Sequence, residues 1–244
     1  SFGSTGMSVM EMSHRAKTYI EIFDETESLV RELMHVPEDY AVLFLHGGAM
    51  EQCAAVPMNL MGKAGKADYV DSGNFASTAM KEAKKYGTAR CVASSADASY
   101  ARIPDLDSGL FDPDADYFHI TTNNTIYGTE LHEDLHVGVP VIADMSSDIF
   151  SRPIDFTDYE LIFAGAQKNL GPAGVTLVNL RKDLDDCINA GGTIICGYKL
   201  TVTNAGLAPY AGELTIIDTP SIATGYLSEY ATGACSCTPP WHIR

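Results

Sequence analysis

The chain has 244 residues, of which 45% are apolar and 20% are charged, a composition typical of a soluble globular protein. Its 32 acidic residues outnumber its 16 basic residues, and the formal net charge of −16 argues against nucleic acid or an anionic membrane as a partner. No run of about 18 apolar residues is present, so no membrane span is expected. The six cysteines form no C-x-x-C pair, which predicts reduced thiols in a cytoplasmic protein.

Up to about residue 186, helical and extended patterns alternate. Helices are predicted over residues 16–36, after Ala49 and over residues 75–86. Short apolar runs predict seven strands: Tyr40–Leu45, Ala67–Val70, Ala89–Ala93, Tyr117–Thr121, Val139–Ala143, Leu161–Ala164 and Val175–Leu180. This alternation predicts an α/β fold with a mainly parallel central sheet. Residues 94–115 are expected to form an acidic surface loop.

The last part of the chain has a different composition. Residues 191–244 contain few charges and are rich in Gly, Thr and Ser. No long amphipathic helix is visible there, and only short strands over residues 200–203 and 214–217 are predicted.

An isolated lysine follows one of the predicted strands. Lys168 lies in a run of small residues, Ala164–Gly174, with no other cation within ten residues on either side. A lysine held near apolar backbone can have a lowered pKa, which makes its amine a nucleophile suited to Schiff-base chemistry. The alternative interpretation is an ordinary solvated turn.

Small residues also follow the first predicted strand. Gly47, Gly48, Ala49 and Met50 lead into a helix, where backbone N–H groups at the helix start can bind a phosphate. The alternative is an ordinary turn between a strand and a helix.

Asp144 ends the apolar strand that starts at Val139. A carboxylate at this point of an α/β sheet can keep a cofactor ring nitrogen protonated. The alternative is that Asp144, Ser146, Ser147 or Asp148 caps a helix.

Three further motifs each have two interpretations. His132 and His136 match the H-E-x-x-H zinc pattern, but glycine and proline on both sides leave little room for the helix it requires, so a charged surface loop is favoured. Arg15 is a candidate anchor for an anionic substrate, or Ser13 caps the following helix. The polar segment 122–129 forms either a ligand site or a turn.

The order of these motifs resembles one enzyme family. The matching segments are residues 7–15, Gly47–Ala49, Asn123–Thr129, Ala143–Ser147, Ser151–Asp155 and Ala164–Gly174. Together they resemble the phosphoserine aminotransferases, which belong to the class V aminotransferases of fold type I and depend on pyridoxal 5'-phosphate. The resemblance covers roughly residues 4–185.

The resemblance implies how the chain holds the cofactor ring. Lys168 is the residue that binds pyridoxal phosphate as a Schiff base and later moves a proton between the substrate carbon and the cofactor. Asp144 pairs with the ring nitrogen, and Thr125 lies near the phenolic oxygen. Phe75 occupies the position of the tryptophan that usually stacks on the ring in this family, so stacking is retained without the indole N–H.

The resemblance also implies contacts to phosphate and substrate. Ala49 and Met50 contribute the helix-start contacts to the cofactor phosphate, and Gln167 adds a side-chain donor. His14 and Arg15 are expected to bind substrate anions, Arg15 in particular the glutamate carboxylate. No metal is expected.

The implied reaction moves an amino group between L-glutamate and 3-phosphohydroxypyruvate, giving O-phospho-L-serine and 2-oxoglutarate, in serine and pyridoxine biosynthesis. We expect a homodimer whose residues 1–186 form the large domain of a three-layer fold, without the usual N-terminal segment of the family. Residues 187–244 are a divergent segment in place of the small domain. Thr238 is a weak match to a partner-subunit phosphate ligand.

Two other hypotheses are kept. In the first, the chain is a relic of the family that still binds the cofactor but is catalytically impaired. In the second, it is a zinc hydrolase that uses His132 and His136.

Overall fold

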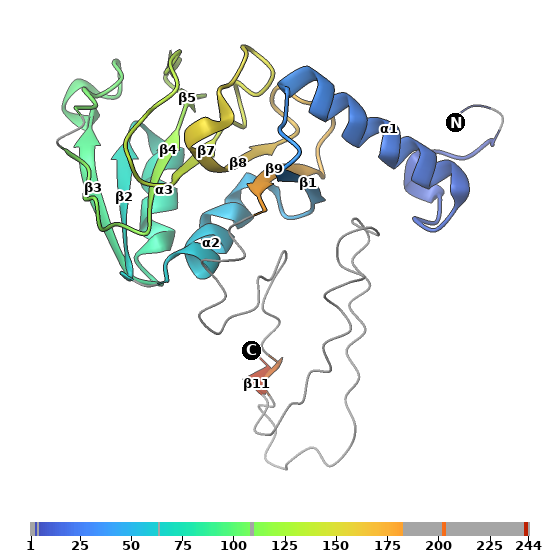
Figure 1. Ribbon diagram of the computed structural model, residues 1–244, viewed down its shortest axis with the longest axis horizontal. Helices are drawn as coiled ribbons and strands as arrows, with labels where there is room; N and C mark the ends of the chain where they lie inside the picture. Colours follow the sequence, from blue (N-terminus) through green and yellow to red (C-terminus); the bar gives the residue numbers. More distant parts are fainter. Residues whose placement is uncertain are drawn as a thin grey trace. The chain divides into compact units, whose positions relative to one another are not determined.

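The computed structural model describes residues 3, 5–62, 64–107, 110–182, 202–203 and 242–243 (Figure 1). Contacts within the chain divide it into two compact units, Ser1–Ile194 and Ile195–Arg244. In the second unit the described residues form one antiparallel pair, β10 (Val202–Thr203) with β11 (His242–Ile243). The strand predicted over residues 200–203 is therefore present in part, and the one predicted over 214–217 lies outside the described residues.

The first unit is built on a seven-stranded sheet with the order β1-β9-β8-β7-β4-β2-β3. Its strands are β1 (Tyr40–Leu45), β2 (Lys66–Asp71), β3 (Thr88–Ser94), β4 (Tyr117–Thr121), β7 (Val141–Asp144), β8 (Tyr159–Gly165) and β9 (Thr176–Arg181). Every neighbouring pair is parallel except for the two pairs that β9 makes, with β8 and with β1. The predicted α/β fold with a mainly parallel sheet is confirmed, and all seven predicted strands are present.

The centre of the sheet is buried along its whole length. Every residue of β4, β7 and β8 is buried. Parallel strands are covered on both faces, so they need continuous apolar runs such as Leu161–Ala164 rather than an alternating pattern. This burial makes the sheet a rigid base for the loops that leave its strands.

Three helices pack on the sheet: α1 (Lys17–Met34), α2 (Gly48–Leu60) and α3 (Asn74–Ala83). The helices α2 and α3 pack against each other, α2 also against β8 and α3 also against β2. At the β1 edge, Phe23 of α1 meets Phe44 edge to face, with ring centroids 5.5 Å apart. The helix α1 continues outward from the sheet toward the N-terminus (Figure 1).

The start of α1 differs from the expectation. Its N-cap is Ala16, with no side-chain cap hydrogen bond. The hydroxyl of Ser13 instead accepts a hydrogen bond from the backbone N–H of Arg15, at 3.3 Å. Ser13 therefore does not cap the helix, which starts at Lys17, one residue inside the predicted range 16–36.

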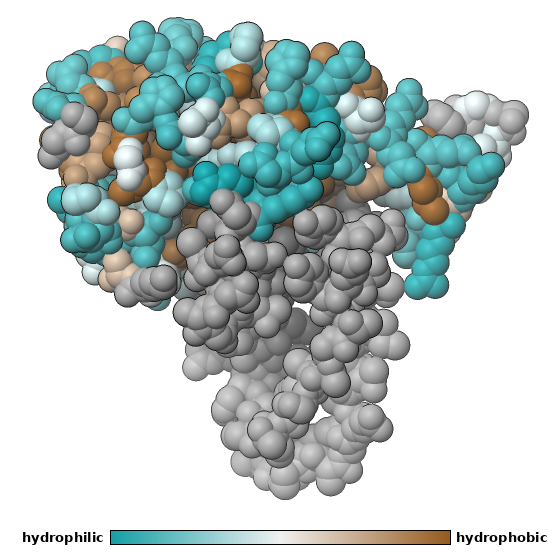
Figure 2. All heavy atoms as spheres, in the orientation of Figure 1, coloured by the Kyte–Doolittle hydropathy of each residue, from teal (hydrophilic) through white to brown (hydrophobic). Residues whose placement is uncertain are grey.

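Hydrophilic residues cover most of the described surface in the view of Figure 2, with apolar residues scattered among them. The most exposed large apolar side chain is that of Met10, at 96%, in the short 3-10 helix η1 (Val9–Glu11). Among the described residues, no helix is both long and apolar enough to cross a bilayer.

Candidate active site

Five strands deliver the candidate residues to one edge of the sheet. The loop Gly47–Met50 follows β1, Phe75 follows β2, Thr125 follows β4, Asp144 ends β7 and Lys168 follows β8. These strands run parallel, so their carboxyl ends meet at the same edge, which is where α/β folds bind ligands.

Lys168 lies at the tip of a closed turn after β8. The amides of Leu170 and Gly171 donate hydrogen bonds to the carbonyl of Ala166, at 3.2 and 2.8 Å, and this closes the turn. The amide Nδ2 of Asn169 donates to the carbonyl of Ile149, at 2.6 Å, and fixes the turn to the segment that follows β7. These hydrogen bonds therefore fix the backbone of the turn and the direction in which the Lys168 side chain leaves it.

The amine of Lys168 has two defined neighbours. Its Nζ donates a hydrogen bond to the hydroxyl of Thr125, at 2.9 Å, and lies 4.1 Å from the ring centroid of Phe75. The second contact is within the range of a cation–π interaction. The side chain is exposed and not buried near apolar backbone as the sequence suggested.

Thr125 is held by a short chain of hydroxyl groups. Its Oγ1 donates to the hydroxyl of Ser147, at 3.0 Å, and Ser147 donates in turn to the side-chain oxygen of Asn123, at 3.0 Å. Because the proton of Thr125 points toward Ser147, the lone pairs of its oxygen remain available to Lys168. The polar segment after β4 thus forms both a turn and part of the site.

A glycine brings Phe75 close to Thr125. A Cβ atom on Gly73 would lie only 2.5 Å from Nδ2 of Asn124. That amide donates a hydrogen bond to the carbonyl of Ser72, at 2.6 Å, which ties the segment after β4 to the start of α3. A larger residue at position 73 would push these two segments apart and separate Phe75 from Thr125.

Asp144 is a buried carboxylate with one oxygen engaged. Its Oδ1 accepts hydrogen bonds from the hydroxyl and the amide of Ser146, at 2.6 and 3.0 Å. Its Oδ2 receives none from any residue that the structure describes. Burial raises the pKa of Asp144, while the two bonds from Ser146 and the charge of Lys168 lower it.

The alternative role for Asp144 as a helix cap does not apply. The residues after it form turns rather than a helix. The local hydrogen bonds from Ser146 give the Asx turn that an aspartate followed two residues later by a donor commonly forms.

The loop after β1 forms the start of α2. Gly47, at φ +84°, is the N-cap residue, and no side chain caps the helix. The first-turn N–H groups therefore point to the edge of the sheet without an intrahelical partner. Ala49 and Met50 belong to this turn, and Met50 is 54% exposed.

Gln167 and Ala49 meet at Gly165, the last residue of β8. A Cβ atom on Gly165 would lie 3.1 Å from Oε1 of Gln167 and 3.4 Å from the Cβ of Ala49. The structure therefore brings Gln167 to the start of α2, as the predicted phosphate contacts require.

His14 and Arg15 make no described contact with this group. Both precede α1, and among the described residues no hydrogen bond or ion pair joins either of them to Lys168, Thr125 or Asp144. Arg15 is exposed, and His14 is half-buried. Thr238 lies outside the described residues.

The zinc hypothesis fails on its structural requirement. Residues 132–136 form no helix, so His132 and His136 do not share a helical face. His136 instead pairs with Asp158, and His132 lies 3.6 Å from the carboxylate of Glu130. Within the described part of the chain, no group of three or more potential ligands is placed to hold a metal.

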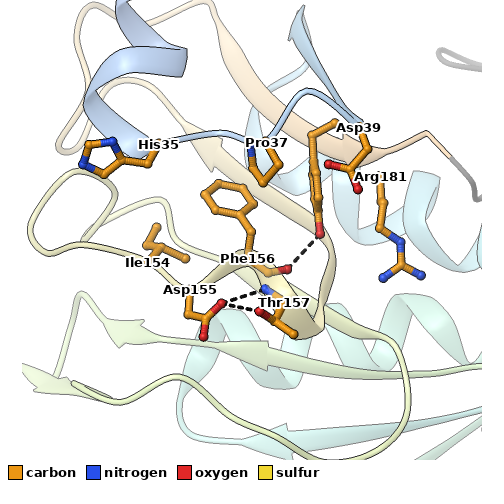
Figure 3. A pocket seen from close by; sticks show the side chains of 9 residues that line it. His35, Pro37, Asp39, Ile154, Asp155, Phe156, Thr157 and Arg181 are labelled. Atoms are coloured by element: carbon orange, nitrogen blue, oxygen red, sulfur yellow. Dashed lines mark hydrogen bonds between the residues drawn. The ribbon is translucent and has the colours of Figure 1, made fainter.

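A pocket of 390 Å³ lies away from the candidate site (Figure 3). Tyr40, Phe156 and Arg181 line it, and the hydroxyl of Tyr40 donates to the carbonyl of Phe156, at 2.8 Å. Tyr40 starts β1 and Arg181 ends the antiparallel β9, so the pocket lies at the opposite edge of the sheet from Lys168. None of the predicted site residues lines it.

A second buried carboxylate near the site affects stability. Asp148 is 6% exposed and accepts a hydrogen bond from the hydroxyl of Thr122, at 2.8 Å. Burial raises its pKa from 3.8 to about 6, although the bond from Thr122 lowers it. The folded state therefore binds this proton more tightly than the unfolded state, so the stability it contributes is present below about pH 4 and is lost as the pH rises through 6.

We therefore expect Asp148→Asn to raise the free energy of unfolding at pH 8 by about 1–3 kcal/mol. At pH 4 the variant and the wild type should be equally stable. Urea unfolding at the two pH values measures both, with the exposed Asp114→Asn as the control that should show no pH-dependent gain. An equal gain at both pH values would contradict the assignment.

Several residues of the site were not predicted. The structure alone shows that Ser146 donates a hydrogen bond to Asp144. It also shows the hydrogen bond from Ser147 to Asn123, which lies behind Thr125. The spacing Asp-x-Ser is a signal for an Asx turn and would have indicated Ser146. The contact between Ser147 and Asn123 joins the turn after β7 to the short strand β5 (Asn123–Asn124) and has no local sequence signal.

The model for the aminotransferase class-V family matches residues 3–214. The chain therefore belongs to the class-V aminotransferases.

Three similar proteins are named phosphoserine aminotransferases. That of Bacteroides thetaiotaomicron is 56% identical over 206 residues, covering 84% of this chain and 57% of the relative. The solved structure from Bacillus circulans subsp. alkalophilus is 45% identical with a TM-score of 0.69, covering 74% of this chain and 50% of that chain. The structure with bound pyridoxal phosphate from Trichomonas vaginalis is 37% identical with a TM-score of 0.69, covering 76% and 56%. The chain thus spans little more than half the length of these relatives.

Proposed function

We propose that residues 1–186 are the large domain of a pyridoxal-phosphate-dependent phosphoserine aminotransferase. The reaction transfers an amino group between L-glutamate and 3-phosphohydroxypyruvate, giving O-phospho-L-serine and 2-oxoglutarate, in serine and pyridoxine biosynthesis. The observation that carries the proposal is the position of the Lys168 amine, 2.9 Å from the hydroxyl of Thr125 and 4.1 Å from the ring of Phe75. The names of the similar proteins support the choice of substrates.

The described residues fit this cofactor. A flat ring needs an apolar face, and Phe75 provides one beside Lys168. A pyridine nitrogen needs a carboxylate, and Asp144 has an oxygen without a hydrogen bond from any described residue. A phosphate needs several N–H donors, which the uncapped start of α2 provides.

Each residue then has a defined task. When bound, pyridoxal phosphate supplies the aldehyde that takes up the amino group and a ring that accepts the electron pair released at the substrate carbon. Nζ of Lys168 would hold the cofactor at its aldehyde carbon, with loss of water, and would move the proton at the reacting carbon. Asp144 would keep a proton on the ring nitrogen through Oδ2. Thr125 would bind the phenolic oxygen, and Phe75 would stack on the ring.

The phosphate and the substrates are held by separate groups. Ala49, Met50 and Gln167 bind the phosphate, and the approach of Ala49 and Gln167 around Gly165 supports this assignment for these two residues. For His14 and Arg15 as anchors of the substrate anions, the support is the sequence motif, since no described contact links them to Lys168.

We further propose that the protein works as a homodimer in the cytoplasm. Lys168 and Gln167 are exposed in the single chain, whereas this chemistry requires a site shielded from water, which a second copy would provide. Cys53 and Cys91 are free, consistent with a reducing compartment. Light scattering on the cofactor-loaded protein tests the assembly: twice the chain mass is expected, and the mass of one chain would contradict it.

A catalytically impaired relic is the second candidate. The observation that favours it is that, among the described residues, no hydrogen bond or ion pair joins the expected substrate anchors His14 and Arg15 to Lys168. A relic binds the cofactor but does not proceed when glutamate is added.

The test loads the protein with pyridoxal phosphate, removes the excess and adds glutamate. We expect one equivalent of 2-oxoglutarate for each loaded site, and phosphoserine after 3-phosphohydroxypyruvate is added. Cofactor uptake without 2-oxoglutarate would identify the relic, and no uptake would overturn both candidates.

Glu51 provides a separate prediction about the phosphate. Its carboxylate folds back over Gly47, where a Cβ atom would lie 1.0 Å from Oε2. A negative charge at this position repels a phosphate bound at the start of α2. Burial raises the pKa of Glu51, but the nearby His46 lowers it.

We expect Glu51→Gln to strengthen binding of pyridoxal phosphate about two- to fivefold at neutral pH, with a larger effect at low salt. Fluorescence titration measures the dissociation constant. Glu32→Gln removes the same charge from an exposed position on α1 and should change the constant little. Weaker binding in Glu51→Gln would contradict the placement of the phosphate.

A further inference from the structure

We propose that Ser146 is a positioning residue that orients the Asp144 carboxylate, so that Oδ2 is the oxygen presented to the cofactor ring nitrogen. This inference rests on the proposed function and adds a residue that the sequence motifs did not assign to the cofactor. Ser146 itself contacts neither the cofactor nor the substrate in this account.

The hydrogen bonds around Ser146 all act on one oxygen. Both its hydroxyl, at 2.6 Å, and its amide, at 3.0 Å, donate to Oδ1 of Asp144. Two donors on the same oxygen fix the rotation of the carboxylate about its Cβ–Cγ bond, which is otherwise a soft torsion. With Oδ1 occupied, the second oxygen is the one available to a ligand.

Ser146 also connects Asp144 to the strand that carries Lys168. Its Oγ accepts a hydrogen bond from the amide of Gly165, at 3.0 Å. Gly165 is the last residue of β8 and lies three residues before Lys168. Ser146 is 2% exposed. Its hydroxyl therefore forms a buried link between Asp144, the partner of the ring nitrogen, and the turn that holds Lys168.

Other groups near Asp144 do not replace this function. Lys168 lowers the pKa of Asp144 by its charge, and Asp148 and Cys53 interact with it electrostatically from the next turn and from α2. Thr121 lies in register beside it on β4, but its buried hydroxyl has no hydrogen-bond partner among the described residues. Thr122 donates only to the backbone carbonyl of Asp144, so among the described residues Ser146 alone donates a hydrogen bond to the Asp144 carboxylate.

The first experiment needs no cofactor. Carbon-13 NMR follows the titration of the Asp144 carboxyl in the cofactor-free protein, for the wild type and for Ser146→Ala, Ser146→Cys and Ser146→Thr. Loss of a hydrogen bond to a buried carboxylate should raise its pKa by about one pH unit or more in the Ala and Cys variants. Ser146→Thr keeps the hydroxyl and should stay close to the wild type.

The matched control is Ser95→Ala. Ser95 is fully buried, and its hydroxyl has no hydrogen-bond partner among the described residues. This variant should leave the titration of Asp144 unchanged. If Ser146→Ala does not fold, Ser146→Cys decides, because cysteine keeps nearly the same volume with only a weak donor.

The second experiment measures binding of pyridoxal phosphate against pH. In the Ala and Cys variants we expect the dissociation constant to increase about tenfold, as loss of outer-shell hydrogen bonds does at metal sites. The acidic limit of binding should move to higher pH together with the pKa of Asp144.

The outcomes separate the two proposals. If the wild type does not bind the cofactor, the proposed function fails, and the NMR titration still decides whether Ser146 holds the carboxylate. If the wild type binds, but the Ala and Cys variants show an unchanged Asp144 pKa and an unchanged dissociation constant, the positioning role of Ser146 is overturned and the proposed function stands.

Discussion

Replacing Lys168 by alanine should reduce amino transfer by at least about 10⁴-fold, as the loss of a residue that forms a covalent bond to the reacting group does in other enzymes. The reason is that Nζ is the only amine that the described contacts place beside both Thr125 and Phe75. Cofactor affinity should also fall, because the covalent attachment is lost while the contacts to phosphate and ring remain. Stopped-flow absorbance with glutamate measures the rate, and equilibrium dialysis measures the affinity.

The control for this variant is Lys85→Ala. Lys85 lies after α3 and contacts Glu82 at the surface, with 65% of its side chain exposed. The Lys85→Ala variant should transfer amino groups at the wild-type rate. If Lys168→Ala keeps more than about a hundredth of the wild-type rate, Lys168 does not have the role proposed for it.

Replacing Asp144 by asparagine should slow the reaction of the loaded protein with glutamate by about 10²- to 10³-fold. Asparagine has nearly the same shape and still accepts the two hydrogen bonds from Ser146 through its oxygen. Its amide then occupies the place of Oδ2 and donates where a carboxylate would accept. The ring nitrogen loses its proton, so the ring no longer accepts electrons well.

Asp148→Asn is the matched control, because it removes a second buried carboxylate four residues further along the chain. Its hydrogen bond goes to Thr122 and not to any residue assigned to the cofactor. Single-turnover kinetics should show the wild-type rate for Asp148→Asn and the slow rate for Asp144→Asn. Equal rates in the two variants would contradict the pairing of Asp144 with the ring nitrogen.

The fold could be predicted from the sequence because its strands are buried on both faces. The apolar run Leu161–Ala164 can lie only in the centre of a sheet, and β8 is buried at every residue. The antiparallel direction of β9 was not predicted, because the sequence does not show that β8 and β9 are neighbours; for neighbouring strands, the short connection over residues 166–175 favours the antiparallel direction. Within the first unit, Ser1–Ile194, the described residues end at Lys182, so the expected domain boundary at residue 186 stays a prediction.

The positions of the site residues were predictable where a strand end fixes them. Asp144 and Lys168 end or follow neighbouring parallel strands, and this alone brings them to one edge of the sheet. The hydrogen bonds around the site and the exposure of its residues could not be predicted in the same way. The bond from Ser147 to Asn123 joins the turn after β7 to β5, 24 residues earlier in the chain, and the exposure of Lys168 depends on what covers this edge of the sheet.

The most direct test of the central claim is to locate the bound cofactor on the chain. The protein is loaded with pyridoxal phosphate, reduced with borohydride and digested, and the modified peptides are identified by mass spectrometry. We expect one adduct per chain, on Lys168, while surface lysines such as Lys85 stay unmodified. An adduct spread over several lysines, or a single adduct on a residue other than Lys168, would contradict the claim.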